Sequence, residues 1–436
     1  MSKRIYGIDL GTTNSLIGLH ETGWLSPIVP SCADVENNKA GAFLYDNMKA
    51  KRSFKTDMSM GVEGTMPRAA SKCVLQELCN QVTDDKVTDV VISVPAYFND
   101  SQRSATIKAA EACGLTVHGL VNEPTAAAMY ISQNQKGIFV IYDLGGGTFD
   151  VSIIDNRFGA YDVQATSGNM IGGDNFDKML MKYFIKNGNV PFHKMNDEQR
   201  LGLQHYCKHQ KETMQKLQVA YEVDLSPFYG SKVLFKPEDY IQLMKLTFSD
   251  TITCLSKLVN QWIPDGEVWD IYLVGGSTHC PFLQQWITEE LGKRPAPLSY
   301  DPDRVVAQGA ALYAHHVALG DIDIKVSDVT KALSIGLHDG TVSNIIPANS
   351  KIPLSMEKMF TNPVDASSLI LDLYQGESLF IQDNEKIGTL IWDFGRNVEA
   401  QGGQVIVEIS VDNKGVISFT ASELLKPPKT IILERN

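Results

Sequence analysis

Two short segments of the same design, each following an apolar run, constrain this chain more than any other feature. Asp9-Leu10-Gly11-Thr12-Thr13-Asn14 comes at the end of one run, and Asp143-Leu144-Gly145-Gly146-Gly147-Thr148 follows another. Each segment places an aspartate at a strand end, followed by glycines and hydroxyls in a tight turn. Glycine allows backbone N–H groups to approach a phosphate closely, and hydroxyls add further donors. A third turn, Gly275-Gly276-Ser277-Thr278, also follows an apolar run.

Together these three turns predict a phosphate clamp between two lobes. The aspartates of the first two turns would face Mg²⁺, mostly through water, because Mg²⁺ gives up its hydration shell reluctantly. The third turn would approach a nucleoside. One glycine-rich turn alone is equally typical of a hairpin, so the prediction depends on finding all three in order.

Strands alternate with helical patterns through the first part of the chain, which favours an α/β layered fold. The expected strands are Ile5–Leu10, Asp89–Val94, Gly137–Tyr142, Phe149–Ile154 and Trp269–Val274, and the expected helices include the stretch from Pro95 to Ala112 and residues 204–220 and 237–262. From Lys331 onward, short alternating runs are split by turn signals such as Asp339-Gly340 and Gly402-Gly403, which predicts an all-β sandwich. We therefore expect a nucleotide-binding domain over residues 1–320, a linker over 321–330 and a β-sandwich domain over 331–436. A plain edge strand is the alternative for residues 321–330.

Composition excludes several classes of protein. The 436 residues carry a formal net charge of −12, which disfavours a protein that coats nucleic acid or a membrane surface. No apolar run reaches the ~18 residues of a membrane span, and Asp9 interrupts the start before a signal-peptide core can form. The seven cysteines are scattered without a CxxC pair, so neither a disulfide framework nor a zinc site is expected, and a cytoplasmic location fits.

Longer motifs narrow the family. The three turns resemble those of the actin-like ATPase superfamily, which also contains sugar kinases. Val94-Pro95-Ala96-Tyr97-Phe98-Asn99-Asp100-Ser101-Gln102-Arg103 and Asn122-Glu123-Pro124-Thr125-Ala126-Ala127-Ala128 resemble the heat shock protein 70 family of chaperones. The resemblance covers nearly the whole chain. It implies a two-lobed, actin-like ATPase domain with ribonuclease H-like topology, followed by an all-β sandwich that binds peptide.

The resemblance also implies roles for the charged residues of the clamp. Asp9 and Asp143 would organise Mg²⁺ and the attacking water, Asp150 would help to hold K⁺, and Glu123 would lie near the reacting water. The expected binding residues for phosphate and nucleoside are Gly11, Thr12, Thr13, Asn14, Gly145, Gly146, Gly147, Gly172, Gly173, Lys208, Lys211, Glu212, Gly275, Gly276, Ser277, His279 and Asp303, with Thr148 also placed among the catalytic residues.

The family's catalytic lysine has two candidates. The family pattern places an aliphatic and a small residue three and four positions after this lysine. Lys55, followed by Met58-Ser59, fits better than Lys51. A fixed ammonium there would neutralise charge on the transferring phosphoryl group.

Several positions depart from the family pattern. The family stacks adenine between two arginines, whereas this chain has Glu212 and His279 at the aligned positions. A glutamate lacks the broad planar face of a guanidinium, so weaker adenine affinity or a relaxed base preference is expected. Only 40 positions separate Lys55 from Pro95 (95 − 55), so the outer part of the first lobe should be trimmed. The linker lacks a continuous leucine run, and the family's helical lid is expected to be absent.

In the β-domain, five residues fall near apolar positions that line the family's peptide cleft: Leu337, Val342, Phe360, Leu369 and Leu371. The alternative is that they belong to the sandwich core, as alternating apolar residues usually do. Pro95 and Arg103 would relay the nucleotide state towards the linker.

The expected function is that of an ATP-dependent chaperone. Slow Mg-ATP hydrolysis would be coupled to binding and release of extended apolar peptide, with ATP/ADP, Mg²⁺ and K⁺ as cofactors. Expected partners are unfolded polypeptides, a J-domain co-chaperone and a nucleotide exchange factor, with no nucleic acid and no membrane. A nucleotide-sensing protein with little turnover is the alternative. A small-molecule kinase is a third candidate, although it would need neither the β-domain nor the two long motifs.

Overall fold

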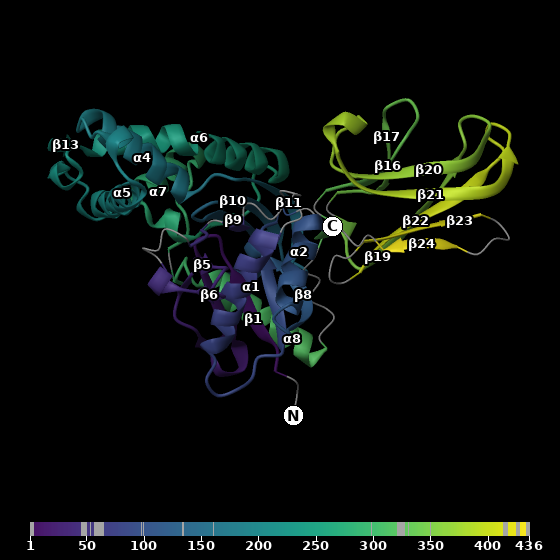
Figure 1. Ribbon diagram of the computed structural model, residues 1–436, viewed down its shortest axis with the longest axis horizontal. Coiled ribbons are helices and arrows are strands. Elements are labelled where there is room, and N and C mark those ends of the chain that lie inside the picture. The colour runs from purple at the N-terminus through teal and green to yellow at the C-terminus, as the bar shows by residue number, and fades with distance from the viewer. Residues whose placement is uncertain are drawn as a thin grey trace.

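The computed structural model shows two regions of sheets and helices and a separate β-rich region formed by the C-terminal part of the chain (Figure 1). The structure describes residues 4–44, 50–52, 54–55, 65–96, 98, 100–132, 135–159, 161–297, 299–320, 328–329, 331–348, 350–412, 417–423 and 428–432. Most of the expected linker, residues 321–327 and 330, lies outside the described residues.

The first sheet has the strand order β3-β2-β1-β7-β8, with β4 paired to β2. Strand β1 pairs antiparallel with β2 and parallel with β7. All six residues of β7 are buried, because its apolar sequence is covered on both faces of the sheet. The elements of this region are β1 (Tyr6–Leu10), β2 (Asn14–Leu19), η1 (His20–Thr22), β3 (Trp24–Leu25), β4 (Val29–Pro30), β5 (Ala33–Asp34), β6 (Lys39–Ala40), η2 (Ala42–Leu44), α1 (Thr65–Asn80), β7 (Asp89–Val94), α2 (Asp100–Glu111), β8 (Thr116–Asn122) and α3 (Glu123–Ser132).

The second sheet, with the order β11-β10-β9-β14, repeats the pairing pattern of the first. Its strand β9 pairs antiparallel with β10 and parallel with β14, as β1 does with β2 and β7. Asp9 and Asp143 are each the penultimate residue of their strand, so the two turns occupy equivalent places in two similar sheets. The elements here are β9 (Ile138–Leu144), β10 (Phe149–Asp155), β11 (Asp162–Asn169), α4 (Gly173–Asn187), η4 (Phe192–Lys194), α5 (Asp197–Leu217), β12 (Tyr221–Val223), η5 (Ser226–Phe228), β13 (Val233–Phe235), α6 (Pro237–Trp262), β14 (Trp269–Val274), η6 (Gly276–His279), α7 (Pro281–Leu291) and α8 (Val305–Leu319).

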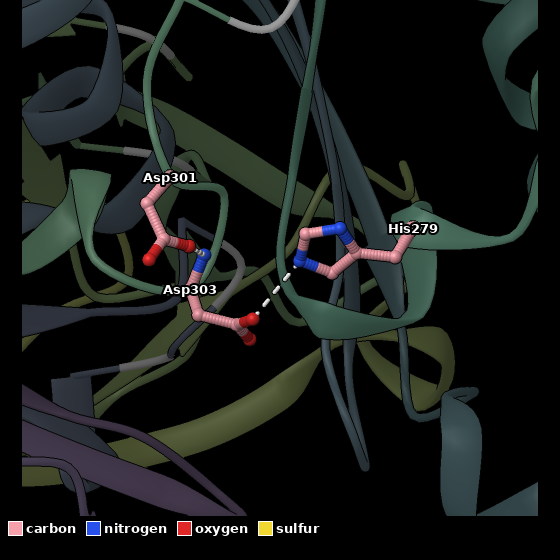
Figure 2. Close-up of side chains that lie close together, drawn as sticks. All are labelled: His279, Asp301 and Asp303. Atoms are coloured by element: carbon pink, nitrogen blue, oxygen red, sulfur yellow. Dashed lines mark hydrogen bonds and ion pairs between the residues drawn. The ribbon is translucent and has the colours of Figure 1, made fainter. Parts of the chain in front are cut away.

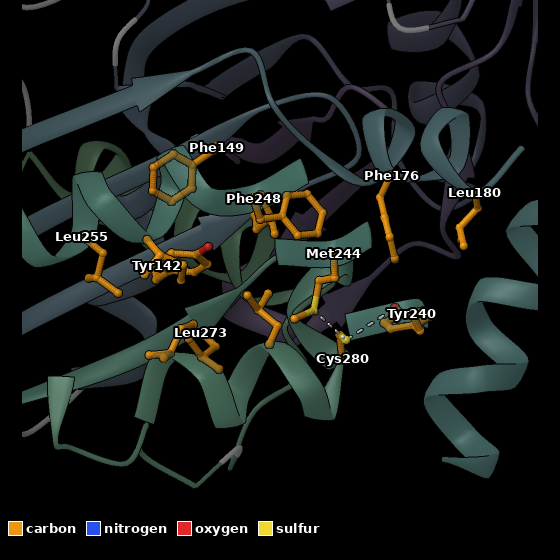
Figure 3. Close-up of a cluster of buried hydrophobic side chains, with 14 of the residues drawn as sticks. Tyr142, Phe149, Phe176, Leu180, Tyr240, Met244, Phe248, Leu255, Leu273 and Cys280 are labelled. Atoms are coloured by element: carbon orange, nitrogen blue, oxygen red, sulfur yellow. Dashed lines mark hydrogen bonds between the residues drawn. The ribbon is translucent and has the colours of Figure 1, made fainter. Parts of the chain in front are cut away.

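Helices α4 to α7 enclose a large core with the second sheet. Figure 3 shows Tyr142 and Phe149 of the sheet near Phe176 of α4 and Phe248 of α6. Tyr142 is fully buried, and its hydroxyl shares a 2.6 Å hydrogen bond with the Thr251 hydroxyl, so no polar group is left without a partner there. Helix α5 begins at a capping box, since the side chains of Asn196 and Gln199 each accept from the other's backbone N–H.

Helices α3 and α8 join the two sheets. Helix α8 packs on β1, β2 and β7 of the first sheet, α3 packs on β9 and β10 of the second, and the two helices pack against each other. The contact is close because Gly309 of α8 has no side chain, and a Cβ there would overlap the carbonyl group of Ala126 in α3. The spacing between the two sheets therefore depends on a residue without a side chain.

The C-terminal region is a sandwich of two four-stranded sheets, with the orders β17-β16-β20-β21 and β19-β22-β23-β24. Burial alternates along β22, so one face of each sheet forms the core and the other faces solvent. Its elements are β15 (Asp328–Val329), β16 (Leu333–Gly336), β17 (Val342–Ile346), β18 (Ser350–Lys351), β19 (Leu354–Thr361), β20 (Ala366–Gln375), η7 (Ile381–Asp383), β21 (Glu385–Val398), β22 (Gln404–Val411), β23 (Ile417–Ser422) and β24 (Lys429–Ile432). Because β15 pairs with β18, residues 328–329 of the expected linker are hydrogen-bonded to the β-domain.

No helix within the described residues is long and apolar enough to cross a bilayer. All seven cysteines are free thiols, and burial raises the pKa of six of them, to about 12 for Cys79 and Cys207 and about 11 for Cys113.

The close contact between α3 and α8 predicts that adding one methyl group at Gly309 destabilises the protein. Gly309→Ala should lower the free energy of unfolding by about 1–3 kcal/mol, because the added Cβ must push two packed helices apart. Gly202→Ala in α5 is the matched control, since its Cβ would lie 3.7 Å from Phe228, an ordinary contact, and alanine favours helix. Thermal and urea unfolding of both variants would test this. Equal or greater stability of Gly309→Ala would contradict it.

Candidate functional site

Three glycine-rich turns meet at one place. A side chain at Gly146 would overlap the Thr13 hydroxyl, so the turns after β1 and β9 are in direct contact. Gly275, at the start of the third turn, has a φ of 82°, and a Cβ there would lie 2.5 Å from the Leu144 carbonyl oxygen. Glycine is required at these positions by close approach and, at Gly275, by backbone conformation.

Hydrogen bonds hold the turn after β9 in place. The N–H groups of Gly173 and Asp174 donate to the carbonyl oxygens of Gly145 (3.0 Å) and Gly146 (2.7 Å). The Ser277 hydroxyl donates to the Gly145 carbonyl at 2.8 Å. The predicted residues Gly172 and Gly173 thus lie at the start of α4, against this turn.

The turns enclose a small cavity of about 90 Å³. Its lining residues are Asp9, Gly11, Thr12, Thr13, Asn14, Lys55, Glu123, Asp143, Gly145, Gly146, Thr148, Val274, Gly275, Gly276, Pro302, Asp303 and Val306. The buried hydroxyls of Thr12 and Thr13 find no hydrogen-bond partner among the described residues. Buried polar groups are normally paired, so these two hydroxyls are suited to donate to a bound phosphate.

Five charged side chains line this cavity: Asp9, Lys55, Glu123, Asp143 and Asp303. Lys55 and Glu123 form a buried ion pair, and Asp9 accepts a hydrogen bond of 2.8 Å from the Ser93 hydroxyl. Burial, with the nearby Glu123 carboxylate, raises the pKa of Asp9 to about 6. Burial also raises the pKa of Asp143 well above its ordinary value, and Glu123 and Asp9 add to the shift. Without a bound cation, burial therefore favours the protonated forms of these carboxyl groups.

The structure separates the two candidate lysines. Lys55 is 2% exposed and its ammonium points into the cavity beside Glu123. Lys51 is exposed, and its backbone bridges to Ala33. Only Lys55 is placed where it could contact a phosphate.

The donor set fits a magnesium ion. Asp9, Asp143 and Glu123 offer carboxylate oxygens, the hard ligands that Mg²⁺ prefers, and with Lys55 they carry a formal charge of −2 when all are ionised. Asp150 is buried on β10 directly opposite Asp143, close to the same strand end.

A second cavity of about 490 Å³ shares five lining residues with the first and extends towards α5. The predicted residues that line it are Thr13, Asn14, Gly146, Gly173, Lys208, Lys211, Glu212, Gly276, Ser277, His279 and Asp303. Its volume is that of a typical small-ligand pocket. A phosphate-sized cavity that opens into a nucleoside-sized one matches the outline of a nucleotide. A larger cavity of about 750 Å³, beside α1, contains none of the predicted residues.

Two ion pairs lie at the second cavity. Lys211 pairs with the largely buried Asp177 at 2.6 Å, and burial nevertheless raises the pKa of Asp177. His279 contacts the Asp303 carboxylate at 3.0 Å, which raises the pKa of His279 and favours its cationic form (Figure 2). The third side chain in this view, Asp301, accepts the backbone N–H of Asp303.

The two predicted coupling residues lie next to the site. The buried Arg103 of α2 donates to the Phe98 carbonyl (3.2 Å) and to the Asn122 side chain (2.6 Å). Asn122 immediately precedes Glu123. Pro95 follows β7, and its carbonyl accepts the N–H of Phe98. Hydrogen bonds therefore link Pro95 and Arg103 through Phe98, and Arg103 contacts Asn122, the residue before Glu123.

The predicted peptide-cleft residues are not all at the surface. Leu369 and Leu371 are 8% and 2% exposed and belong to the sandwich core, and Phe360 packs against it. Leu369 and Leu371 therefore agree with the stated alternative of core residues, because alternation points them inward, and their contact with peptide stays a prediction. Leu337 is exposed, and Val342 is partly buried.

An exposed apolar edge lies beside Leu337. We define this apolar edge as Leu337, Leu379 and Phe380, which are 37%, 73% and 53% exposed. Two backbone hydrogen bonds connect the loop after β16 with the segment after β20. The N–H of Val342 donates to the Leu379 carbonyl, and the N–H of Ile381 donates to the Gly340 carbonyl. Sequence reasoning identified only the first of these three residues.

Sequence reasoning also missed several residues in and beside the two cavities. Ser93 holds Asp9, Asp177 holds Lys211, and Phe176, Tyr240 and Phe248 line the second cavity. One signal was available, since Ser93 interrupts the apolar residues 90–94 of β7. Asp177 and the aromatic residues come from helices whose packing the pattern alone does not specify.

A comparison with protein families finds a match for this chain. The model of the Hsp70 protein family matches residues 44–433, which is most of the chain and includes Lys55, both long motifs and the β-sandwich.

The raised pKa of Asp9 predicts how stability changes with pH. Without Mg²⁺ and nucleotide, ionising the buried Asp9 opposes folding, so wild-type stability should fall as pH rises from about 4 through about 6. Asp9→Asn should therefore be more stable at pH 8, by up to about 3 kcal/mol, and the difference should vanish near pH 4.

Urea unfolding of wild type and Asp9→Asn from pH 4 to 8 would test this prediction. Asp265→Asn, in the exposed loop before β14, is the surface control. A wild-type protein that is more stable than Asp9→Asn throughout the range would mean that Lys55 stabilises the Asp9 carboxylate more than burial disfavours it.

Proposed function

Since this chain belongs to the Hsp70 family, we propose that it is an ATP-dependent molecular chaperone whose slow Mg-ATP hydrolysis controls binding of extended apolar peptide. The family binds ATP and ADP with Mg²⁺, and its members are generally ATPases. The proposal for this chain depends on one observation: the buried Lys55–Glu123 pair and the two aspartates share a cavity that opens into a nucleoside-sized one.

Four of the charged residues that line the small cavity have a proposed task. Lys55 would contact the transferring phosphoryl group, where an ammonium stabilises the charge of the transition state. Glu123 would hold Lys55 in place and orient the attacking water. Asp9 and Asp143 would bind hydrated Mg²⁺, which neutralises phosphate charge when bound, and Asp150 would contribute to a K⁺ site. The hydroxyls of Thr12, Thr13 and Thr148 would donate to phosphate oxygens.

The domain organisation supports this function. We propose an actin-like, two-lobed nucleotide domain over residues 1–320, because the two sheets share one pairing pattern and each places an aspartate at the clamp. Residues 321–330 would connect it to the peptide-binding β-sandwich of 331–436. Unfolded polypeptides, a J-domain co-chaperone and an exchange factor are the proposed partners, and the cytoplasm is the proposed location.

A nucleotide-sensing protein with little turnover is the second candidate. Glu212 and His279 favour it, because both charged side chains line the cavity where the base would lie. Both candidates predict nucleotide binding, and they differ in whether ATP is cleaved.

A single-turnover assay with excess protein, labelled ATP, Mg²⁺ and K⁺ would distinguish them. Lys55→Ala should lower the hydrolysis rate about 100-fold or more while nucleotide still binds, because it removes one transition-state contact. Lys51→Ala is the matched control and should hydrolyse ATP at the wild-type rate, since Lys51 is exposed outside the cavity. ATP bound but uncleaved by the wild type would favour the sensing role.

Peptide binding should alter nucleotide handling, because coupling between two sites is reciprocal. We expect a saturating extended apolar peptide to change nucleotide affinity by about fivefold or more. Leu337→Ser should weaken this response by removing part of the apolar edge, whereas Val268→Ser, at an exposed residue before β14, should not. Calorimetric titration of nucleotide with and without peptide would measure the change. Identical affinities would exclude coupling.

A further inference from the structure

One face of α5 forms a wall of the second cavity. Lys208, Glu212 and Lys216 recur at intervals of four residues and all line this cavity, so the three side chains lie along one face of the helix. A carboxylate thus lies in the nucleoside-sized cavity, with a lysine one helical turn away on either side.

Most of the other polar side chains of this cavity already have partners within the protein. Lys211 pairs with Asp177, and His279 with Asp303. The Gln215 side chain donates to the Tyr240 hydroxyl at 2.8 Å. By contrast, the half-buried Glu212 carboxylate forms no hydrogen bond or ion pair with any residue that the structure describes. Glu212 thus offers a carboxylate acceptor to a ligand in this cavity.

We propose that Glu212 selects the base of the bound nucleotide and favours guanine over adenine. The inference rests on the proposed function, because it requires nucleotide to bind with its base in this cavity, and it would make GTP rather than ATP the preferred nucleotide of that function. A carboxylate has two acceptor oxygens, and guanine presents two parallel donors, N1–H and N2–H, that match them. Lys208 and Lys216 would offer ammonium donors for guanine O6.

Adenine is a poorer match for the same carboxylate. Its corresponding edge offers a single N6–H beside N1, which is an acceptor whose lone pair would face the negative charge. Inosine retains N1–H and O6 but lacks the N2 amine. The expected order of affinity is therefore guanine, then inosine, then adenine, at constant ribose and phosphates.

The test is calorimetric titration of the full chain with the Mg²⁺ salts of GDP, IDP and ADP. Wild type should bind GDP about tenfold more tightly than ADP, with IDP between them. Glu212→Gln should reverse the preference towards ADP, because an amide can pair with both N6–H and N1 of adenine. Glu198→Gln, an exposed glutamate on the same helix, is the matched control and should retain the wild-type order.

Several outcomes would overturn the inference. Tighter binding of ADP than of GDP by wild type, unchanged in Glu212→Gln, would exclude base selection and leave the proposed function standing. An equal loss for all three bases in Glu212→Gln that is absent with 2′-deoxy nucleotides would assign Glu212 to the ribose instead. Failure of wild type to bind any of the three would refute the proposed function as well. The wild-type order alone tests the inference should a variant fail to fold.

Discussion

The site depends on the unfavourable concentration of negative charge in a small, largely buried cavity. Asp9, Asp143 and Glu123 surround a cavity of about 90 Å³ that contains one ammonium group. Burial alone would drive two of these carboxylates to take up protons, and their raised pKa values express that tendency. A divalent cation reverses the balance, because it stabilises the ionised forms that burial disfavours. Metal binding and carboxylate ionisation are thus expected to be linked in this site.

The surrounding fold makes this concentration of charge possible. Two sheets with the same pairing pattern each place an aspartate at a strand end, and α3 and α8 fix the sheets against each other. Glu123 is the first residue of α3, so the helix that joins the sheets also carries the partner of Lys55. The turns can then meet only because Gly146 leaves room for Thr13.

The elements that the sequence predicts well are those with an unambiguous periodicity. Strands β7 and β14 and helix α6 have the expected boundaries, because continuous apolar runs and a proline-initiated helix leave few alternatives. Contacts between elements that lie far apart in the sequence are harder to predict. The partner of Lys211 is Asp177, and nothing in the local pattern of α4 indicates it. The burial of Leu369 and Leu371 could not be predicted for a similar reason. An alternating pattern does not determine which face of a strand packs in the core.

The buried cysteines have a practical consequence for measuring motion in this chain. Alkylating reagents attack the thiolate, and a raised pKa keeps Cys32, Cys73, Cys79, Cys113, Cys207 and Cys280 in the neutral thiol form near pH 7. A cysteine introduced on an exposed strand of the sandwich would ionise far more readily. Maleimide dyes should therefore label the introduced position preferentially at short reaction times. Fluorescence distances between domains then become accessible with most native cysteines left in place.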